Sequence, residues 1–266
     1  MLIKQLKLGI VGAPIATGLS FTTSFLIAAI PFIKKSAVLN FFTGKFNWKL
    51  TGQLLYNGSS EGVSSLATAI STFVFNMAFM RIAGEVGVSA FTAIGYISLF
   101  ASLIVCGVSA GIGPVISYNY GAQLHDRVKQ MMKISCKMAM IMGTALVVLI
   151  FLFGKYLIMM FVSDNQAVLD LALYGSKIYA FTFFFNGLNI LFSGYFTSIG
   201  DALSSIIVAV CRGMIFILLG ISILPQFIGI SGVWMTVPVA EVLTLLVVIF
   251  LFKKGNLKKA PELVEA

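Results

Sequence analysis

Seven apolar segments, each long enough to cross a lipid bilayer, follow one another along this sequence of 266 residues. We place them at residues 8–33, 54–80, 91–117, 131–153, 167–198, 202–224 and 230–252. About 20 apolar residues in a helix span the hydrocarbon core of a bilayer. Backbone polar groups inside that core must bond within their own segment, so such segments fold as helices. The sequence therefore predicts an all-α integral membrane protein with about seven transmembrane helices.

The charge of the chain fits a membrane protein better than a nucleic-acid-binding one. The net charge is +9, from 18 basic and 9 acidic residues, but only 10% of the residues are charged. Soluble domains carry about 25%. The basic residues lie mostly between the apolar segments, where they set the orientation of the helices in the membrane. We expect membrane lipid and small molecules as partners, and no nucleic acid.

The orientation follows from where lysine and arginine gather. Twelve of them fall in residues 34–49, 127–137 and 253–259, which seven helices place on one side of the membrane. Four fall on the other side. Because cytoplasmic loops are enriched in Lys and Arg, we predict a multi-pass protein of the cell membrane with a cytoplasmic C-terminus. The N-terminus would then lie outside, and we expect the chain to be part of a longer protein.

A single polar stripe runs along the second segment. Five of its members recur at helical spacing and lie within a sector of about 80°. They are Glu61, Ser65, Thr68, Thr72 and Asn76, and Asn57 precedes them in the same segment. A charged side chain within so apolar a segment faces protein or water rather than lipid. We predict that the stripe lines a cavity.

Glu61 is the candidate site for a coupling cation or proton. Burial favours the neutral form of a carboxyl group and an arriving cation favours the charged form, so protonation and cation binding compete. The alternative is a local cap or salt bridge near the cytoplasmic entry. The serine and threonine residues of the stripe also have an alternative, which is to bond to the carbonyl four residues earlier.

The fifth segment presents a second polar face. Tyr179, Asn186 and Asn189 are spaced by 7 and 3 residues and share one side of a helix. Rings and amides on this face would contact an aromatic or cationic compound. The alternative is a core of aromatic side chains with hydrogen-bonded amides.

Two breaks and one buried charge are candidates for structural or gating roles. Gly111, Gly113 and Pro114 predict a helix break that acts as a bend or a fixed kink. Pro238 predicts a kink in the last segment.

Arg212 lies within the sixth segment, where a buried arginine needs a partner. It is three turns from Asp201, too far for a direct pair. We expect the partner to be a group on another helix or a backbone carbonyl, and Glu241 in the last segment is one candidate.

The sequence contains no phosphate-binding glycine loop, no nucleophile–base set and no cluster of metal-ligating residues. We therefore expect no enzyme activity, no metal site and no cofactor other than a coupling ion, Na⁺ or H⁺.

Several stretches resemble the multidrug and toxic compound extrusion (MATE) family of cation-coupled antiporters. Residues 57–61 with 72–76 are similar to the family's seventh helix, and residues 111–122 to the end of its eighth. Residues 232–241 are similar to its twelfth helix, and residues 9–13 to the entry of its sixth.

The resemblance implies a division of the chain. The family has twelve helices in two six-helix lobes. Residues 1–33 would be the last helix of the first lobe, and residues 34–53 a cytoplasmic linker with a short amphipathic helix. Residues 54–253 would form the six-helix second lobe, and residues 254–266 a cytoplasmic tail. The rest of the first lobe would be a missing partner.

The resemblance also implies a function. Inward flow of Na⁺ or H⁺ would drive export of drugs and amphipathic organic cations by alternating access. The family has an acidic residue on the helix of Glu61, which favours a coupling role. A second membrane-embedded acid, found in some members, is represented here only by Asp170 at the outer end of its segment.

Three alternatives stay open. A lipid-linked precursor flippase of the same superfamily would have a more cationic cavity. A truncated chain would be inert. A seven-helix receptor explains the sequence less well than truncation does.

Overall fold

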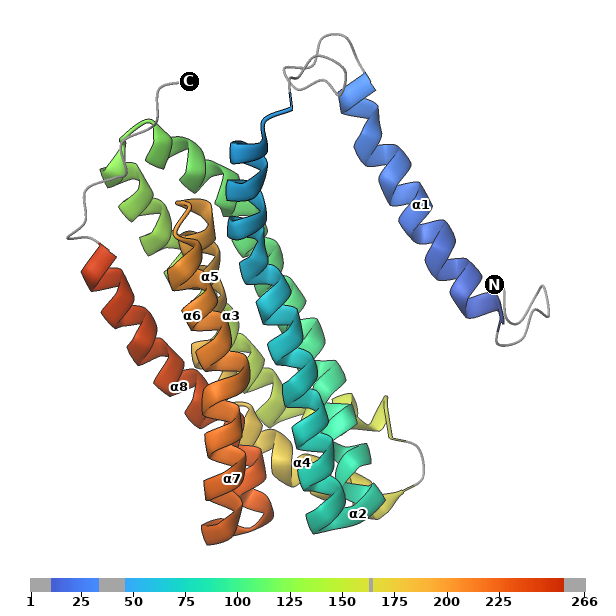
Figure 1. Ribbon diagram of the computed structural model, residues 1–266. Helices are drawn as coiled ribbons and strands as arrows, with labels where there is room; N and C mark the ends of the chain where they lie inside the picture. Colours follow the sequence, from blue (N-terminus) through green and yellow to red (C-terminus); the bar gives the residue numbers. More distant parts are fainter. Residues whose placement is uncertain (1–10, 34–45, 163–164, 256–266) are drawn as a thin grey trace. The chain divides into compact units, whose positions relative to one another are not determined.

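The structure, a computed structural model, describes residues 11–33, 46–162 and 165–255, and every regular element in them is a helix (Figure 1). It divides into two compact units, Met1–Gly52 and Gln53–Ala266. The first unit contains α1, Gly12–Ile33, and the start of α2. Of the predicted linker, residues 34–45 lie outside the described residues, as do residues 1–10 and most of the predicted tail, 256–266.

The second unit is a bundle of apolar helices. Its elements are α2 (Trp48–Gly121), α3 (His125–Met159), α4 (Gln166–Tyr179), α5 (Thr182–Ser198), α6 (Ala202–Val210), the π-helix η2 (Cys211–Ile215), α7 (Phe216–Ile228) and α8 (Ile230–Gly255). Four of its spans are long and apolar enough to cross a membrane, and a fifth forms if α4 and α5 are one bent span. With α2 counted as two helices and α1 added, the prediction of about seven is confirmed.

Helix α2 runs down the bundle and back up (Figure 1). Its 74 residues contain one residue with non-helical dihedral angles, Gly84, at φ 60° and ψ −149°. A positive φ at this ψ is accessible almost only to glycine. Gly84 therefore separates the second and third predicted segments, and no longer loop intervenes.

Two other breaks differ from those predicted. Helix α2 continues through Gly111, Gly113 and Pro114 to Gly121, and all three have helical dihedral angles, so the helix is not broken there. The fifth segment, predicted as one helix, is bent by 55° between α4 and α5. The bend falls at Ala180 and Phe181. Neither residue is a glycine or a proline, so the sequence did not indicate the bend.

The largest core cluster surrounds Trp234 of α8, which is 1% exposed. Its ring lies 4.4 Å from that of Phe79, and Phe91 stacks on Phe79 at 5.1 Å, both between ring centroids. Gly175 of α4 lies against the indole, where a β-carbon would collide with the ring. This cluster joins α2, α4 and α8, and it also includes Ile158 of α3 and Ile217 of α7.

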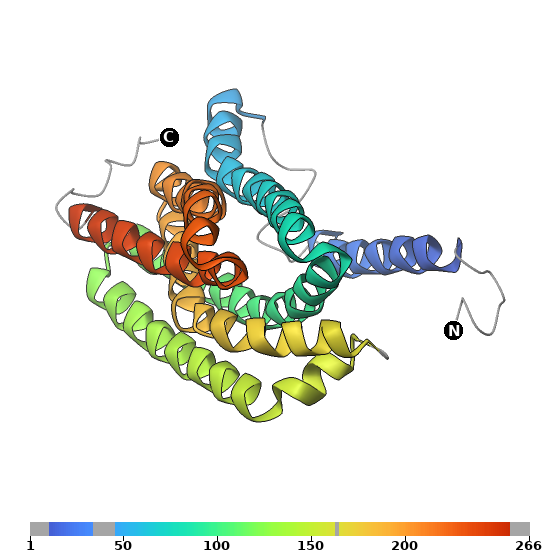
Figure 2. The same ribbon diagram turned by 90° about the horizontal axis from the view of Figure 1, so that it is seen from below.

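Helix α3 lies on the outside of the bundle against α5 (Figure 2). Gly143 makes this contact possible, because a β-carbon there would collide with the backbone carbonyl of Phe183. Small residues at membrane helix interfaces let backbones approach closely in this way.

We expect Gly143→Ala to destabilise the bundle by about 1–3 kcal/mol, because the added methyl group meets backbone rather than a flexible side chain. A lower apparent melting temperature of the purified protein in detergent measures the effect. The matched control is Gly107→Ala in α2, where nothing lies within 4 Å of the new β-carbon. Equal shifts for the two variants would contradict the packing described.

Candidate functional site

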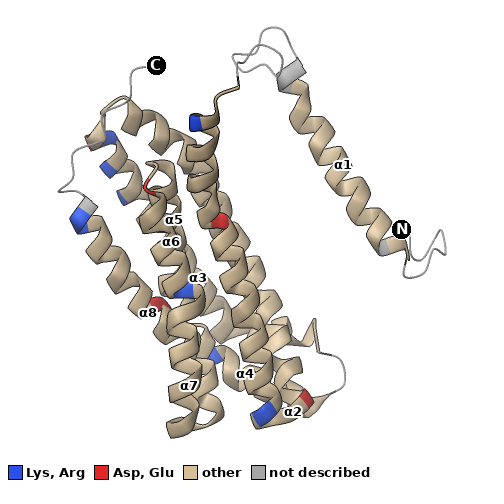
Figure 3. Ribbon diagram, viewed as in Figure 1, with Lys and Arg blue, Asp and Glu red and all other residues tan. Residues whose placement is uncertain are grey.

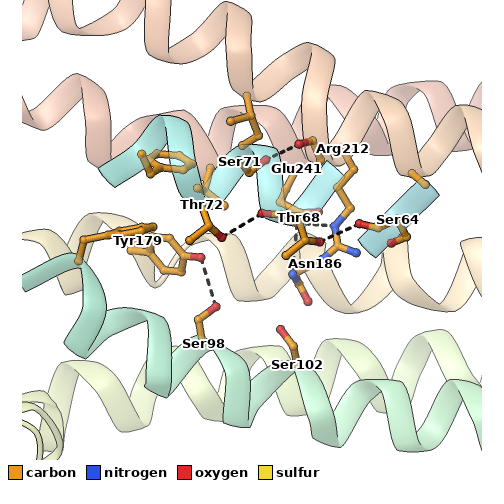
Figure 4. Close-up of a pocket in the computed structure, with 16 residues that line it drawn as sticks. Ser64, Thr68, Ser71, Thr72, Ser98, Ser102, Tyr179, Asn186, Arg212 and Glu241 are labelled. Carbon is orange, nitrogen blue, oxygen red and sulfur yellow. Dashed lines mark hydrogen bonds and ion pairs between the residues drawn. The ribbon is translucent and has the colours of Figure 1, made fainter. Parts of the chain in front are cut away.

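A polar cavity of about 220 Å³ lies inside the second unit (Figure 4). Helices α2, α4, α5, α6, α7 and α8 and the π-helix η2 contribute to its walls. Hydroxyl groups of α2 dominate the polar lining, and they belong to Ser64, Thr68, Ser71, Thr72, Ser98 and Ser102. The apolar lining includes Phe75, Phe91, Ile217 and Val237.

An ion pair between Arg212 and Glu241 lies at the wall of the cavity. Arg212 Nε donates to Glu241 Oε1 over 2.8 Å. The Glu241 side chain is 4% exposed and that of Arg212 is 28% exposed. The predicted pairing of these two residues is confirmed. Charged side chains are sparse along the middle of the helices (Figure 3), so this pair dominates the local electrostatics.

Two amides of α5 complete the environment of Glu241. Asn186 Nδ2 donates to Oε1 over 3.2 Å. Asn189 Nδ2 donates to Oε2 over 2.6 Å and to the Glu241 carbonyl over 2.9 Å. Both carboxylate oxygens therefore accept hydrogen bonds, so no polar atom of this buried side chain lacks a partner.

The π-helix η2 presents Arg212 to the cavity. The amide of Phe216 donates to the carbonyl of Cys211, five residues earlier, as in a π-turn. The hydroxyl of Ser71 in α2 donates to the carbonyl of Gly213. Gly213 also lets α2 approach, because a β-carbon there would collide with Ala67. A rare local geometry is thus held in place by α2.

Several hydroxyl groups of the cavity are already engaged. Thr72 donates to the Thr68 carbonyl and Thr68 to the Ser64 carbonyl, each over 2.9 Å. The hydroxyls of Ser98 and Tyr179 lie 3.2 Å apart. Figure 4 shows these bonds around the cavity. The hydroxyls of Ser64 and Ser102 make no hydrogen bond to any residue that the structure describes.

The structure gathers part of the predicted site at this cavity. Six predicted residues line it: Thr68, Thr72, Tyr179, Asn186, Arg212 and Glu241. Asn189 lies behind Glu241 and is fully buried. The bend between α4 and α5 brings Tyr179 and Asn186 to the same cavity although they do not share one straight helix.

The remaining stripe residues lie elsewhere. Asn57 donates to the carbonyl of Thr197 over 3.2 Å. Ser65 is exposed and donates to the Glu61 carbonyl. Asn76 is half-buried outside the lining. Glu61 is exposed, and its carboxylate has no hydrogen-bond or ion-pair partner among the described residues.

Sequence reasoning missed four serines of the lining: Ser64, Ser71, Ser98 and Ser102. Ser64 and Ser71 are seven residues apart, and Ser98 and Ser102 are four apart. Each pair has helical spacing, so a search for small hydroxyl residues on one helix face would have found them.

Comparison with known proteins agrees with the resemblance in the sequence. The family described as MatE matches residues 62–222. Multidrug export protein MepA of Staphylococcus aureus (strain NCTC 8325 / PS 47) is 26% identical over 273 residues, which cover all of this chain and 59% of that protein. The Staphylococcus saprophyticus MepA is 22% identical over 270 residues with the same coverage. The chain thus spans about three-fifths of the length of these relatives.

Two solved structures share the fold. The crystal structure of MATE in complex with MaL6 superposes with a TM-score of 0.87 at 22% identity and covers 96% of this chain and 58% of that one. A MOP superfamily transporter from Pyrococcus furiosus superposes with a TM-score of 0.88 at 22% identity and the same coverage.

We expect Arg212→Met and Glu241→Met each to destabilise the protein by about 3–5 kcal/mol, because each leaves one charge buried without its partner. The double variant removes both charges and should lose much less than the sum of the two. The free energies of unfolding in detergent of the wild type, the two single variants and the double variant form a double-mutant cycle, which gives the coupling energy between the two side chains. Glu61→Gln serves as an exposed control with little effect. Additive losses would show that the two side chains do not interact.

Proposed function

The chain belongs to the MATE family, and we propose from this that it forms one lobe of a secondary exporter for small amphipathic organic molecules. The observation that carries the proposal is the polar, charge-bearing cavity within a membrane-spanning helical bundle. Ionisable groups inside membrane segments mark substrate and ion pathways. The relatives are multidrug export proteins, which supports export of compounds rather than uptake.

We propose that the working transporter contains a second lobe. The chain spans 59% of the length of its curated relatives. In repeat-built transporters, substrate sites lie between the repeats, and rocking of one against the other exposes them alternately to each side. The missing first lobe, with α1 as its last helix, would supply the opposite wall of the transport path.

The coupling role, for Na⁺ or H⁺, stays with Glu61 in this proposal. Its carboxylate is exposed and has no partner among the described residues, so a proton or a cation can reach its oxygens. Glu241 is a poorer candidate. Its oxygens already accept from Arg212, Asn186 and Asn189, and these donors would repel an arriving cation.

The cavity gives little support to the alternative of a lipid-linked precursor flippase, which would have a more cationic cavity. The described residues that line it include one arginine, and Glu241 balances its charge. The transport assay described next tests the alternative that the chain is truncated and inert.

Transport is measured in proteoliposomes with 2-naphthoate, 2-naphthamide and 2-naphthylmethylammonium, three probes that differ in the charge of one group. The chain is tested alone and together with the first lobe of a MATE transporter. We expect an inward Na⁺ or H⁺ gradient to accelerate outward movement of at least one probe. Transport that no gradient accelerates, in either form of the protein, would contradict the proposed function.

Glu61→Gln should reduce the gradient-driven rate about tenfold or more, because an amide cannot exchange a proton or hold a cation as a carboxylate does. Glu85→Gln is the matched control, since Glu85 is another exposed acid of α2. An unchanged rate for Glu61→Gln would assign the coupling to another residue.

A further inference from the structure

The two charges of the cavity are not equally available to a ligand. Glu241 is 3% exposed, and both of its carboxylate oxygens are occupied by side-chain donors. A cationic ligand would have to displace Arg212 or an asparagine to reach it. The negative member of the pair is therefore shielded from the cavity.

The positive member is open. Arg212 is bound to Glu241 through Nε alone. A guanidinium carries five N–H donors in a planar fork, so four remain on its two terminal amino groups. These make no hydrogen bond to any described residue, and the side chain is 28% exposed at the cavity.

Neutral hydroxyl groups of the cavity provide further hydrogen-bond donors for an anion. Ser64 and Ser102 have hydroxyls with no partner among the described residues, and each can donate to an anion. Figure 4 shows the Ser102 side chain pointing toward the space between α2 and the Arg212–Glu241 pair. Free donors and an open guanidinium together suit an anionic group.

The size and the walls of the cavity restrict the rest of the ligand. A volume of about 220 Å³ is below the range of about 300–1,000 Å³ usual for a complete drug-sized ligand. Phe75, Phe91 and Ile217 form an apolar wall beside the polar one. The cavity thus fits the polar head group of a ligand together with the apolar, aromatic part of the ligand next to that head group.

We propose that this cavity binds the carboxylate of an amphipathic substrate, with the terminal amino groups of Arg212 as the main contact. The proposal rests on the proposed function, because it names the substrate class of the same exporter. It departs from the preference for organic cations that the sequence resemblance implies.

Charge favours a carboxylate over a phosphate ester. The Arg212–Glu241 pair sums to zero, so a monoanion leaves one net negative charge beside the apolar wall of the cavity, and a phosphomonoester leaves up to two. The cost of an uncompensated charge rises steeply in a low-dielectric interior. Arginine also matches the planar carboxylate with two parallel hydrogen bonds.

The test is binding of tritiated 2-naphthoate to the purified full chain in detergent, with unlabelled 2-naphthamide and 2-naphthylmethylammonium as competitors. We expect 2-naphthoate to bind about tenfold or more tightly than either competitor. Arg212→Lys keeps the positive charge beside Glu241 and loses the planar fork, so it should weaken 2-naphthoate binding about tenfold.

A second variant and a control accompany this test. Ser102→Ala removes one hydroxyl donor and should weaken binding about threefold whether or not Arg212→Lys folds. Lys177→Gln removes a basic residue of α4 that is exposed outside the cavity lining and should leave binding unchanged. The proposal is overturned if the ammonium probe binds most tightly, or if Ser102→Ala and a folded Arg212→Lys both bind 2-naphthoate normally.

The transport assay separates this proposal from the proposed function. Binding of 2-naphthoate through Arg212 without gradient-driven transport of any probe would overturn export and keep the site. Gradient-driven transport that prefers the ammonium probe would keep export and overturn the carboxylate site.

Discussion

The buried carboxylate of Glu241 is the constraint on which the second unit depends. An unpaired charge in a membrane-embedded bundle is costly, so the fold must bring donors to it. They come from two other elements, Arg212 from η2 and two asparagines from α5. Because these side chains must reach one carboxylate together, α5, η2 and α8 are fixed relative to one another. The cavity borders this group of side chains, and Arg212, Glu241 and Asn186 form part of its wall.

The local deformation at Arg212 and the packing of α2 support each other. A π-turn interrupts the regular bonding of a long apolar span, and a hydroxyl of α2 bonds to a carbonyl within it. Close approach of α2 at Gly213 makes that bond possible. The helix that carries most of the hydroxyl groups of the cavity is thus also the helix that holds the arginine in place. Rigid support of this kind is what a binding site needs.

Much of the architecture was readable from the sequence, because apolar length and the spacing of basic residues report directly on membrane spans. The sequence also named Glu241 as a candidate partner of Arg212, since a buried charge requires a partner, but it did not exclude a backbone carbonyl in that role. The bend at Ala180 and Phe181 and the π-turn were not predictable, because both arise from tertiary packing and no glycine or proline marks the bend. Helical spacing placed Glu61 and Thr68 on one stripe, yet only Thr68 reaches the cavity, since which part of a long helix lines a cavity depends on its neighbours.

The most direct measurement of the central claim is the distance between Arg212 Nε and the Glu241 carboxyl carbon in a lipid bilayer. Solid-state NMR with ¹⁵N-arginine and ¹³C-glutamate labels provides it, with Glu241→Gln as the assignment control. We predict a strong dipolar coupling between these two atoms and a separate resonance for the terminal amino groups of Arg212. A coupling no stronger than that of an unpaired arginine would contradict the claim that this ion pair organises the bundle.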